Sequence, residues 1–231
     1  MPTFDFSLLL SGTVHDMLAA GLRLSLTLLG VTLPLALLLG VLVALARLAP
    51  LAPLRAAGWL FVESQRNVPL LAHMLFWYFG APELLPDGAR EWLYAHNAEA
   101  VAALVSLTLY YGAFMAEDVR SGIRAVPGVQ LEAGRALGLG FLPAMRLVVL
   151  PQALRAAVPP LVSQTLNLWK DTSIATVIGV AELMYQAAKV EAATFRSFEA
   201  FTFATASYLA VSLLITALAA WHHRRHPPRA L

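Results

Sequence analysis

The sequence predicts an all-α membrane protein that crosses the bilayer with five helices and forms one domain over residues 1–231. Hydrophobic residues make up 59% of the chain and charged residues 13%, whereas soluble domains carry about 25% charged residues. The mean hydropathy is +0.69. Long uncharged apolar runs also alternate with short segments that contain Pro, Gly and charged residues. These observations indicate a polytopic membrane domain that occupies about 18–223.

The first two expected spans differ in how clearly the sequence defines them. Residues 24–46 carry no charge and are long enough, at 1.5 Å per residue, to cross about 30 Å of hydrocarbon. Residues 68–80 are too short to cross alone, so they must be extended by 54–67. Pro69 lies at the junction, lacks a backbone N–H and disfavours helix in the residue before it. The second span is therefore expected to be broken near this proline.

Two polar residues, Arg66 and Asn67, lie beside the expected break. Glu63 precedes Arg66 by three residues, a spacing that suits an interfacial ion pair on one helix face. Alternatively, Arg66 and Asn67 begin a half-helix that faces a solute path. The residues themselves leave both interpretations open.

Residues 100–115 form the third expected span, and residues 201–221 form the fifth. Glu117 and Asp118 follow the third span and either cap its aqueous end or extend it with charges inside. The fifth span is uncharged and ends in Trp221, a residue type enriched at membrane interfaces.

The fourth expected span contains two adjacent charges. Residues 156–169 and 172–181 are uncharged, and each is too short to cross alone. Joined, they cross the bilayer and place Lys170 and Asp171 within its thickness or at a helix break. Ionisable groups inside a membrane are costly and usually functional. The candidates for contact with a zwitterionic solute are Arg66, Asn67, Lys170, Asp171, Thr172 and Ser173, with a structural role at helix breaks, dimer contacts or a gate as the alternative.

A central block, about 121–151, separates the third and fourth spans and is too polar to cross a bilayer. Helix formers precede Gly138, and Gly138 and Gly140 allow a sharp turn through positive φ. A second short amphipathic piece, 141–149, is expected to end at Pro151. The sequence therefore predicts a helix–turn–helix on the membrane surface with a small, close-packing face.

The distribution of arginine sets the expected orientation. With five spans, one side of the membrane receives Arg47, Arg55, Arg120, Arg124, Arg135, Arg146, Arg155, Arg224, Arg225 and Arg229. Because cytoplasmic loops are rich in Lys and Arg, the N-terminus is expected outside, and the C-terminus and central block in the cytoplasm. Residues 1–11 lack the basic region and cleavage site of a signal peptide.

Several kinds of chemistry are not supported by the sequence. There is no cysteine, so disulfide, thiol and Fe–S chemistry is excluded. Neither Lys170 nor Lys189 closes a G-x-x-x-x-G-K-[ST] loop, so ATP hydrolysis by this chain is not expected. H-E-x-x-H, G-x-S-x-G and basic helix faces with interleaved aromatics are also absent. His222, His223 and His226 are better explained as part of a basic segment at anionic lipid than as metal ligands.

The central block carries a spaced signature. It consists of Glu132-Ala133-Gly134, Gly138 after three further residues, and Val148-x-Leu150-Pro151 after nine more. This pattern resembles the coupling loop of importer-type ABC permeases, in which Ala and Ile replace Gly134 and Val148. Further stretches resemble the polar amino acid uptake permeases, the histidine, glutamine, glutamate, arginine and opine group; they lie at 66–71, 109–113, 150–155, 170–173 and 177–180.

This resemblance implies a type I ABC importer permease fold with a cytoplasmic coupling helix. It also implies a dimer with a second permease chain, identical or different, in a bacterial inner membrane. A separate ATPase dimer would bind ATP and Mg²⁺, so no cofactor is expected on this chain. An extracytoplasmic amino-acid-binding protein would deliver the solute. The implied ATPase-coupling residues are Glu132, Ala133, Gly134, Gly138, Leu150 and Pro151.

The implied function is ATP-driven import of a polar amino acid by alternating access. The run 66–71, together with 76–79 and 82–86, looks most like permeases for acidic amino acids, which favours glutamate, aspartate or glutamine. One alternative is a passive channel or ion-coupled carrier, which would not need the coupling block. A second is a structural assembly factor, which predicts no dependence on a solute.

Overall fold

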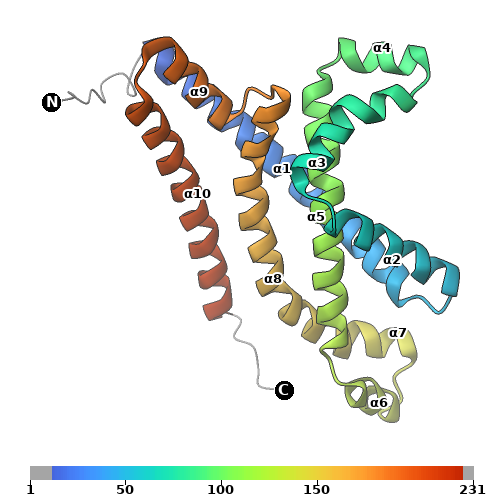
Figure 1. Cartoon of the computed structure of the whole chain (residues 1–231). Coiled ribbons are helices and arrows are strands. Elements are labelled where there is room, and N and C mark those ends of the chain that lie inside the picture. The colour runs from blue at the N-terminus through green and yellow to red at the C-terminus, as the bar shows by residue number, and fades with distance from the viewer. Residues whose placement is uncertain (1–11, 226–231) are drawn as a thin grey trace. The chain divides into compact units, whose positions relative to one another are not determined.

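The computed structural model describes residues 12–225. The expectations for residues 1–11, and for His226 and Arg229, concern residues outside this described part. Between residues 12 and 225 every regular element is helical (Figure 1). The α-helices are α1 (Gly12–Leu48), α2 (Ala52–Arg66), α3 (Leu70–Leu75), α4 (Asp87–Ala95), α5 (Ala98–Arg124), α6 (Gly128–Ala136), α7 (Phe141–Ala144), α8 (Leu150–Asp171), α9 (Leu183–Thr194) and α10 (Ser197–Arg225). The π-helical turns are η2 (Phe76–Gly80) and η4 (Met145–Val149), and the 3₁₀ turns are η3 (Ala81–Leu84) and η5 (Thr172–Ile178).

Four helical segments of the described part are long and apolar enough to cross a membrane. They are Gly12–Leu48, Ala98–Arg124, Phe141–Ile178 and Ser197–Arg225. Each contains most of one apolar run that the sequence identified, and Pro34 lies inside α1 without ending it. The described part is therefore all-helical, and four of the five predicted spans correspond to candidate membrane helices.

The segment predicted as the second span is not one continuous helix. Helix α2 ends at Arg66, and α3 begins at Leu70. Between them Pro69 adopts φ −59° and ψ 142°, an extended conformation that ends the helical hydrogen-bond ladder. The expected break beside Arg66 and Asn67 is therefore present.

The turn in the central block is confirmed at Gly138 but not at Gly140. Gly138 has φ +86°, whereas Gly140 has φ −62°. The backbone N–H of Gly138 donates to the Arg135 carbonyl at 3.0 Å, and that of Leu139 donates to the Gly134 carbonyl at 3.2 Å. These two bonds form a Schellman motif, which closes α6 and places the positive φ on the first glycine alone.

The expectation that the second amphipathic piece ends at Pro151 was wrong. Helix α7 continues through the π-helical turn η4 directly into α8, and Pro151 lies in the first turn of α8. Proline fits there because η4 already changes the hydrogen-bond register, so the missing N–H interrupts no regular α-helical ladder. The surface helix and the fourth apolar run therefore belong to one helical segment.

The chain divides into two compact units. Unit 1 comprises Met1–Pro34, Val68–Thr108 and Leu166–Leu214, and unit 2 comprises Leu35–Asn67, Leu109–Thr165 and Ile215–Leu231. Each of α1, α5, α8 and α10 contributes one part to each unit. Each unit therefore packs segments that are far apart in the sequence.

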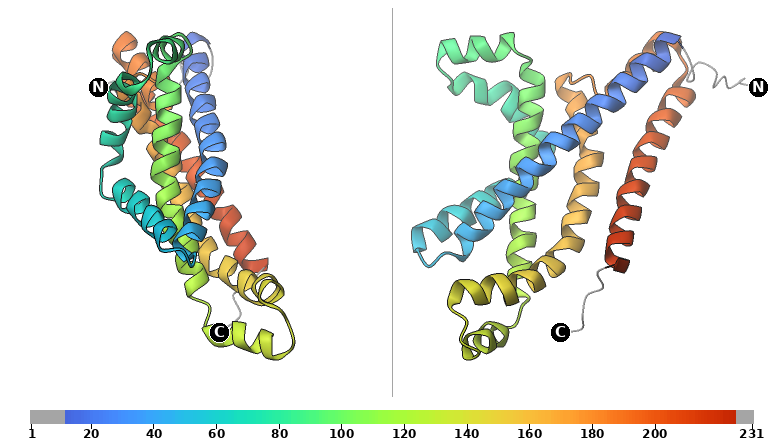
Figure 2. Two further views of the ribbon diagram at one scale, coloured as in Figure 1. Left: turned by 90° about the vertical axis from the view of Figure 1, so that its right-hand side faces the viewer. Right: turned by 180° about the vertical axis from the view of Figure 1, so that it is seen from behind.

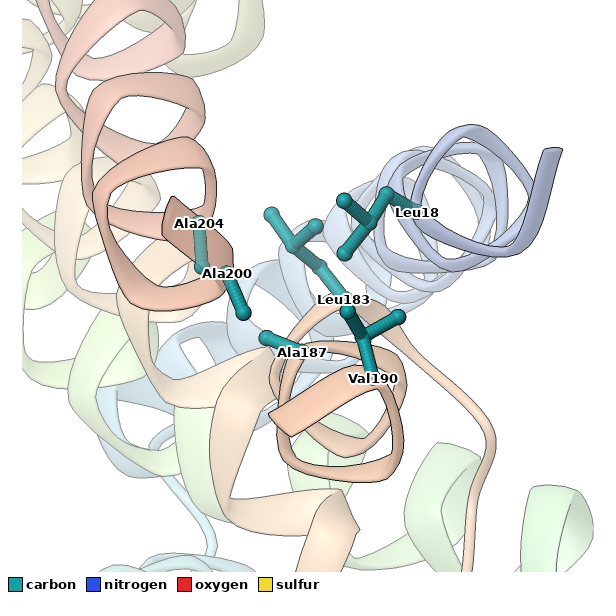
Figure 3. Packing of buried hydrophobic residues seen from close by; sticks show 6 residues of the cluster. All are labelled: Leu18, Leu183, Ala187, Val190, Ala200 and Ala204. Atoms are coloured by element: carbon teal, nitrogen blue, oxygen red, sulfur yellow. The ribbon is translucent and has the colours of Figure 1, made fainter. Parts of the chain in front are cut away.

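Unit 1 contains a buried apolar cluster where α9 packs against α1 and α10. Its buried members are Leu18, Leu183, Ala187, Val190, Ala200 and Ala204 (Figure 3). The three alanines let the helix backbones of α9 and α10 approach closely, as small residues do between membrane helices. This cluster fixes α9 beside the chain segments that precede and follow it.

Unit 2 is held together by glycines at helix contacts. A Cβ atom added to Gly40 of α1 would lie 2.9 Å from the Met115 Cβ of α5. One added to Gly122 of α5 would lie 2.8 Å from the Ala153 carbonyl oxygen of α8. Neither site has room for a side chain, so these glycines set the separation of the helices.

The close approach of α1 to α9 in unit 1 generates a stability prediction. A Cβ atom at Gly21 would lie 2.9 Å from the Leu183 Cα and 3.0 Å from the Glu182 carbonyl oxygen, both of them backbone atoms. Gly21→Ala should therefore destabilise the protein by roughly 1–3 kcal/mol. The matched control is Gly30→Ala in the same helix, where a Cβ atom meets nothing within 4 Å. Thermal unfolding of the purified protein in detergent measures both variants, and equal unfolding midpoints would contradict the close approach.

Candidate functional site

The first candidate site is the coupling hairpin, defined here as α6, the turn at Gly138, α7 and η4 in unit 2. Figures 1 and 2 show α6 and α7 as a short helical hairpin. A Cβ atom on Gly134 would lie 3.4 Å from both the Ala144 Cβ and the Val148 Cγ2, so the buried Gly134 marks where α6 packs on the second arm. Gln152 of α8 also donates from Nε2 to the Gln130 side chain of α6 at 3.5 Å. The hairpin is therefore a packed element and not an open loop.

The other predicted coupling residues lie on the surface of unit 2. Glu132, Ala133 and Gly138 are exposed, as are Leu150 and Pro151 in the first turn of α8. Large apolar side chains of the hairpin are exposed as well, namely Val129, Leu137, Phe141, Leu142 and Leu147. Clustered exposed apolar side chains mark interaction sites, and the alternating exposed acid, small and apolar residues suit a protein partner.

The six solute-path candidates fall into two groups, one in each unit. In unit 2, Arg66 ends α2 and its guanidinium lies 5.0 Å from the centroid of the Phe114 ring of α5. Asn67 caps α2, and its side-chain Nδ2 donates to the Glu63 carbonyl oxygen at 2.8 Å and to Glu63 Oε2 at 2.9 Å. Glu63 is therefore held by Asn67, while Arg66 faces the α5 aromatic ring.

In unit 1, the other four candidates lie where α8 changes into the 3₁₀ turn η5. Lys170 is exposed and Asp171 half-buried at the end of α8. The buried Thr172 donates from Oγ1 to the Trp169 carbonyl at 2.8 Å, and Ser173 donates to the Lys170 carbonyl at 2.8 Å. The charges thus lie at a change of helix type, as one of the two sequence interpretations expected.

A buried carboxylate that sequence reasoning missed lies close to this group in unit 1. Glu182 is 0% exposed and caps the N-terminus of α9. The backbone N–H groups of Met184 and Tyr185 donate to its carboxylate, each at 3.0 Å. The usual N-cap residues are Ser, Thr, Asp, Asn and Gly, so no local sequence signal identified Glu182 as the cap of α9.

Three hydroxyl groups from other segments also donate to the Glu182 carboxylate. Tyr208 of α10 donates to Oε2 at 2.9 Å, and Ser25 of α1 donates to Oε2 at 3.1 Å. Thr176 of η5 donates to Oε1. Trp169 connects this network to the end of α8. Its indole N–H donates to the Tyr208 carbonyl at 3.0 Å, and the ring centroids of Trp169 and Tyr208 lie 5.0 Å apart.

A second charged cluster joins α1 to α5 in unit 2. Glu117 forms ion pairs with Arg47 at the end of α1 and with Arg120 one turn along α5. All three side chains are at most 24% exposed, so water screens the attraction within these pairs less than in surface pairs. The sequence left open whether Glu117 caps the aqueous end of the third span or lies within an extended span; in the structure its carboxylate links α1 to α5.

The comparisons with known proteins agree with this geometry. A family model described as the binding-protein-dependent transport system inner membrane component matches residues 24–226. The chain belongs to this family. It is an ABC transporter permease, which agrees with the coupling signature in its central block.

Curated relatives of this permease have similar lengths. The chain is 36% identical over 211 residues to the probable glutamine ABC transporter permease protein GlnM of Bacillus subtilis (strain 168). This alignment covers 90% of this chain and 88% of GlnM. It is also 36% identical over 185 residues to the glutamate/aspartate import permease protein GltJ of Escherichia coli (strain K12), and this alignment covers 78% of this chain and 75% of GltJ.

Solved structures share the fold of this permease. A chain from a crystal structure of an amino acid ABC transporter with histidines matches with a TM-score of 0.84 and 29% identity, covering 97% of this chain and 100% of that one. A chain of the MetNI methionine ABC transporter in an inward-facing form matches with a TM-score of 0.71 and 19% identity, covering 93% and 98%. The second match shows the fold alone.

The Glu182 network generates a second stability prediction. Glu182→Gln keeps the size of the side chain but replaces one accepting oxygen by an NH₂ group that faces donors. At least one donor then loses its acceptor, and the variant should lose roughly 1–3 kcal/mol of stability. Glu91→Gln, an exposed position in α4, is the matched control and should unfold like the wild type. Unfolding midpoints in detergent measure the difference, and a wild-type midpoint for Glu182→Gln would show that the network is not stabilising.

Proposed function

We propose that this permease is the membrane-spanning subunit of an ATP-driven importer that moves a polar amino acid into the cytoplasm by alternating access. The observation that carries the proposal is the coupling hairpin, a packed element that exposes an acid, small residues and large apolar side chains. Because the chain has no P-loop, ATP and Mg²⁺ are bound by a partner ATPase. The hairpin is where that partner docks.

Within the hairpin the predicted coupling residues take different roles. Glu132 and Ala133 are exposed and contact the ATPase directly, while buried Gly134 lets the two arms pack together. Gly138 provides the tight turn that only a residue tolerant of positive φ allows. Leu150 and Pro151 begin the helix that continues from the hairpin, so movement of the docked ATPase acts on the membrane segment through them.

Glutamate, aspartate or glutamine is the proposed solute. The relatives named above include a glutamate/aspartate import permease and a probable glutamine permease. In unit 1, the path candidates Lys170, Asp171, Thr172 and Ser173 provide charges of both signs and neutral hydrogen-bonding groups, as a zwitterion requires. In unit 2, the path candidates are Arg66 and Asn67.

The complete transporter would contain a second permease chain, because few helices per chain are available to enclose a path. Two relatives from one organism support this composition, GlnM and the probable glutamine ABC transporter permease protein GlnP of Bacillus subtilis. An extracytoplasmic binding protein would deliver the amino acid. In the bacterial inner membrane, α2 with α3 and η2 would form the broken second span. Five spans in all would leave the N-terminus outside and the C-terminus in the cytoplasm.

A charge at the hairpin turn tests the proposed function. Gly138→Asp places a branched acid at the exposed turn, yet Asp tolerates positive φ better than most residues, so insertion into the membrane should persist. In proteoliposomes with the ATPase and binding protein, amino acid uptake and solute-stimulated ATP hydrolysis should fall at least about tenfold, which corresponds to a loss of about 1.4 kcal/mol in coupling.

The matched control is Gly88→Asp in α4, where a Cβ atom also meets nothing within 4 Å. This variant should import like the wild type. Normal uptake by Gly138→Asp would refute the docking role of the hairpin, and a wild type that imports none of glutamate, aspartate and glutamine would refute the proposed substrate class.

Cysteine labelling tests the proposed topology. The chain has no native cysteine, so single cysteines at Gly128 and Gly88, both exposed, can be labelled without background. An impermeant thiol reagent should modify Gly128→Cys only from the cytoplasmic face and Gly88→Cys only from outside. Because the two positions flank α5, modification of both from the same face would show that α5 does not cross the membrane and would overturn the five-span topology.

A further inference from the structure

An apolar cavity that the proposed function does not use lies in unit 1, between η2, η3, α4 and the first two turns of α5. Figure 1 shows α4 beside the N-terminal end of α5. The cavity has a volume of about 320 Å³, which lies within the range of pockets that hold small ligands. We name it the α4 cavity, and its walls include the aromatic residues Trp77, Tyr78 and Trp92 and the alanines Ala89, Ala98 and Ala102.

Polar contacts outside the α4 cavity fix its walls. Arg90 of α4 forms ion pairs with Glu83 of η3 at 3.3 Å and with Asp87 at 2.6 Å, which holds α4 beside η3. The Tyr78 hydroxyl of η2 donates to Glu99 Oε1 of α5 at 3.4 Å. The space beside the small alanine side chains is therefore a feature of the fold at this end of α5.

The lining of the α4 cavity selects an apolar occupant. Within residues 12–225 no charged side chain lines it, and the Tyr78 hydroxyl on its wall already donates to Glu99. A zwitterionic amino acid would leave both of its charges unpaired there, which is costly. Apolar cavities instead hold apolar molecules and exclude water. The occupant is therefore an alkyl chain, and the cavity is not a part of the solute path.

The length of α5 places the α4 cavity at the level of the lipid headgroups. At 1.5 Å per residue, the 27 residues of α5 extend about 40 Å, which matches a bilayer with its headgroup regions included. Residues 98–105 therefore pass from one headgroup region into the adjoining acyl chains. Trp92 is 59% exposed beside them, as expected for a tryptophan at a membrane interface. With the topology proposed above, this is the outer leaflet.

The charges around the α4 cavity favour one class of headgroup. Residues 76–105 contain the acids Glu83, Asp87, Glu91 and Glu99, whereas Arg90 is the one arginine or lysine among them. Arg90 is paired with two of the acids, and Glu91 is exposed and belongs to none of the ion pairs found among residues 12–225. This excess of negative charge attracts an ammonium group and repels an anionic headgroup.

We propose that the α4 cavity binds one acyl chain of a phospholipid whose headgroup carries a primary ammonium group. The alkyl chain occupies the space beside the alanines of α4 and α5, and the surrounding carboxylates attract the ammonium. A primary ammonium donates up to three hydrogen bonds to carboxylates, whereas the quaternary ammonium of a choline headgroup donates none. Phosphatidylethanolamine should therefore bind more tightly than phosphatidylcholine, and phosphatidylglycerol more weakly than either.

Photocrosslinking to the purified permease–ATPase complex in detergent tests the site. The probe is phosphatidylethanolamine with a diazirine at the end of one acyl chain, and mass spectrometry of peptides locates the label. The label should lie within residues 76–105, and excess unlabelled phosphatidylethanolamine should displace it better than phosphatidylcholine or phosphatidylglycerol does.

Two variants of α4 separate the cavity from the membrane surface around it. Ala89 is exposed and lines the cavity, so Ala89→Phe fills the space and should lower labelling of 76–105 by about tenfold or more. Ala95→Phe is the matched control, because Ala95 is exposed in the same helix and is not part of the cavity wall. Glu91→Lys should keep the labelling but lose most of the preference for phosphatidylethanolamine over phosphatidylglycerol.

The wild-type competition decides the proposal even if Ala89→Phe does not assemble. No label within 76–105, equal displacement by the three lipids, or unchanged labelling in Ala89→Phe would overturn it. If Ala89→Phe keeps the label but loses stimulation of ATP hydrolysis by the binding protein, the cavity takes a protein side chain, and the lipid site is also overturned. Because labelling does not depend on import, each of these failures would leave the proposed function standing.

Discussion

The hydrogen-bond network of the buried Glu182 carboxylate is the interaction on which unit 1 depends. No cation pairs with it among residues 12–225, so its burial is tolerable only because two backbone N–H groups and three hydroxyl groups donate to it. The donors come from α1, η5, α9 and α10. All four segments must be in place at once for the carboxylate to be satisfied, which makes their arrangement cooperative. The apolar cluster around Leu183 then follows, because the same segments meet there.

The same network bears on the solute path. Tyr208 connects Glu182 to Trp169, which directly precedes Lys170. The 3₁₀ turn that begins at Thr172 is tied to the carboxylate through Thr176. A charged pair at a change of helix type would otherwise be free to shift, because 3₁₀ hydrogen bonds are weaker than α-helical ones. The network therefore holds the position of residues that the sequence identified only by their charge.

Local and length-based signals predicted most of the fold. Of the five spans that apolar length predicted, four correspond to helices long enough to cross a membrane. Pro69 and Gly138 marked a break and a turn, because proline and glycine act through their own backbone. Pro151 misled because a π-helical turn, which no sequence pattern announced, absorbed the missing N–H. Glu182 was missed because its donors lie up to 157 residues away in the chain. Adjacent acids such as Glu117 and Asp118 could not be told apart, because which one meets an arginine depends on packing between helices.

The exposed apolar side chains of the coupling hairpin also affect the amount of this protein that a cell can produce without aggregation. Leu137 is 85% exposed and Leu142 76% exposed, one on each side of the turn in the hairpin. If an ATPase covers this surface, a permease made in excess of the ATPase leaves an apolar patch exposed, to which other proteins bind nonspecifically. Such orphan subunits are substrates for aggregation and quality-control proteolysis. The exposed surface of the hairpin therefore requires the cell to make the permease and its ATPase in matched amounts, and this requirement is separate from transport.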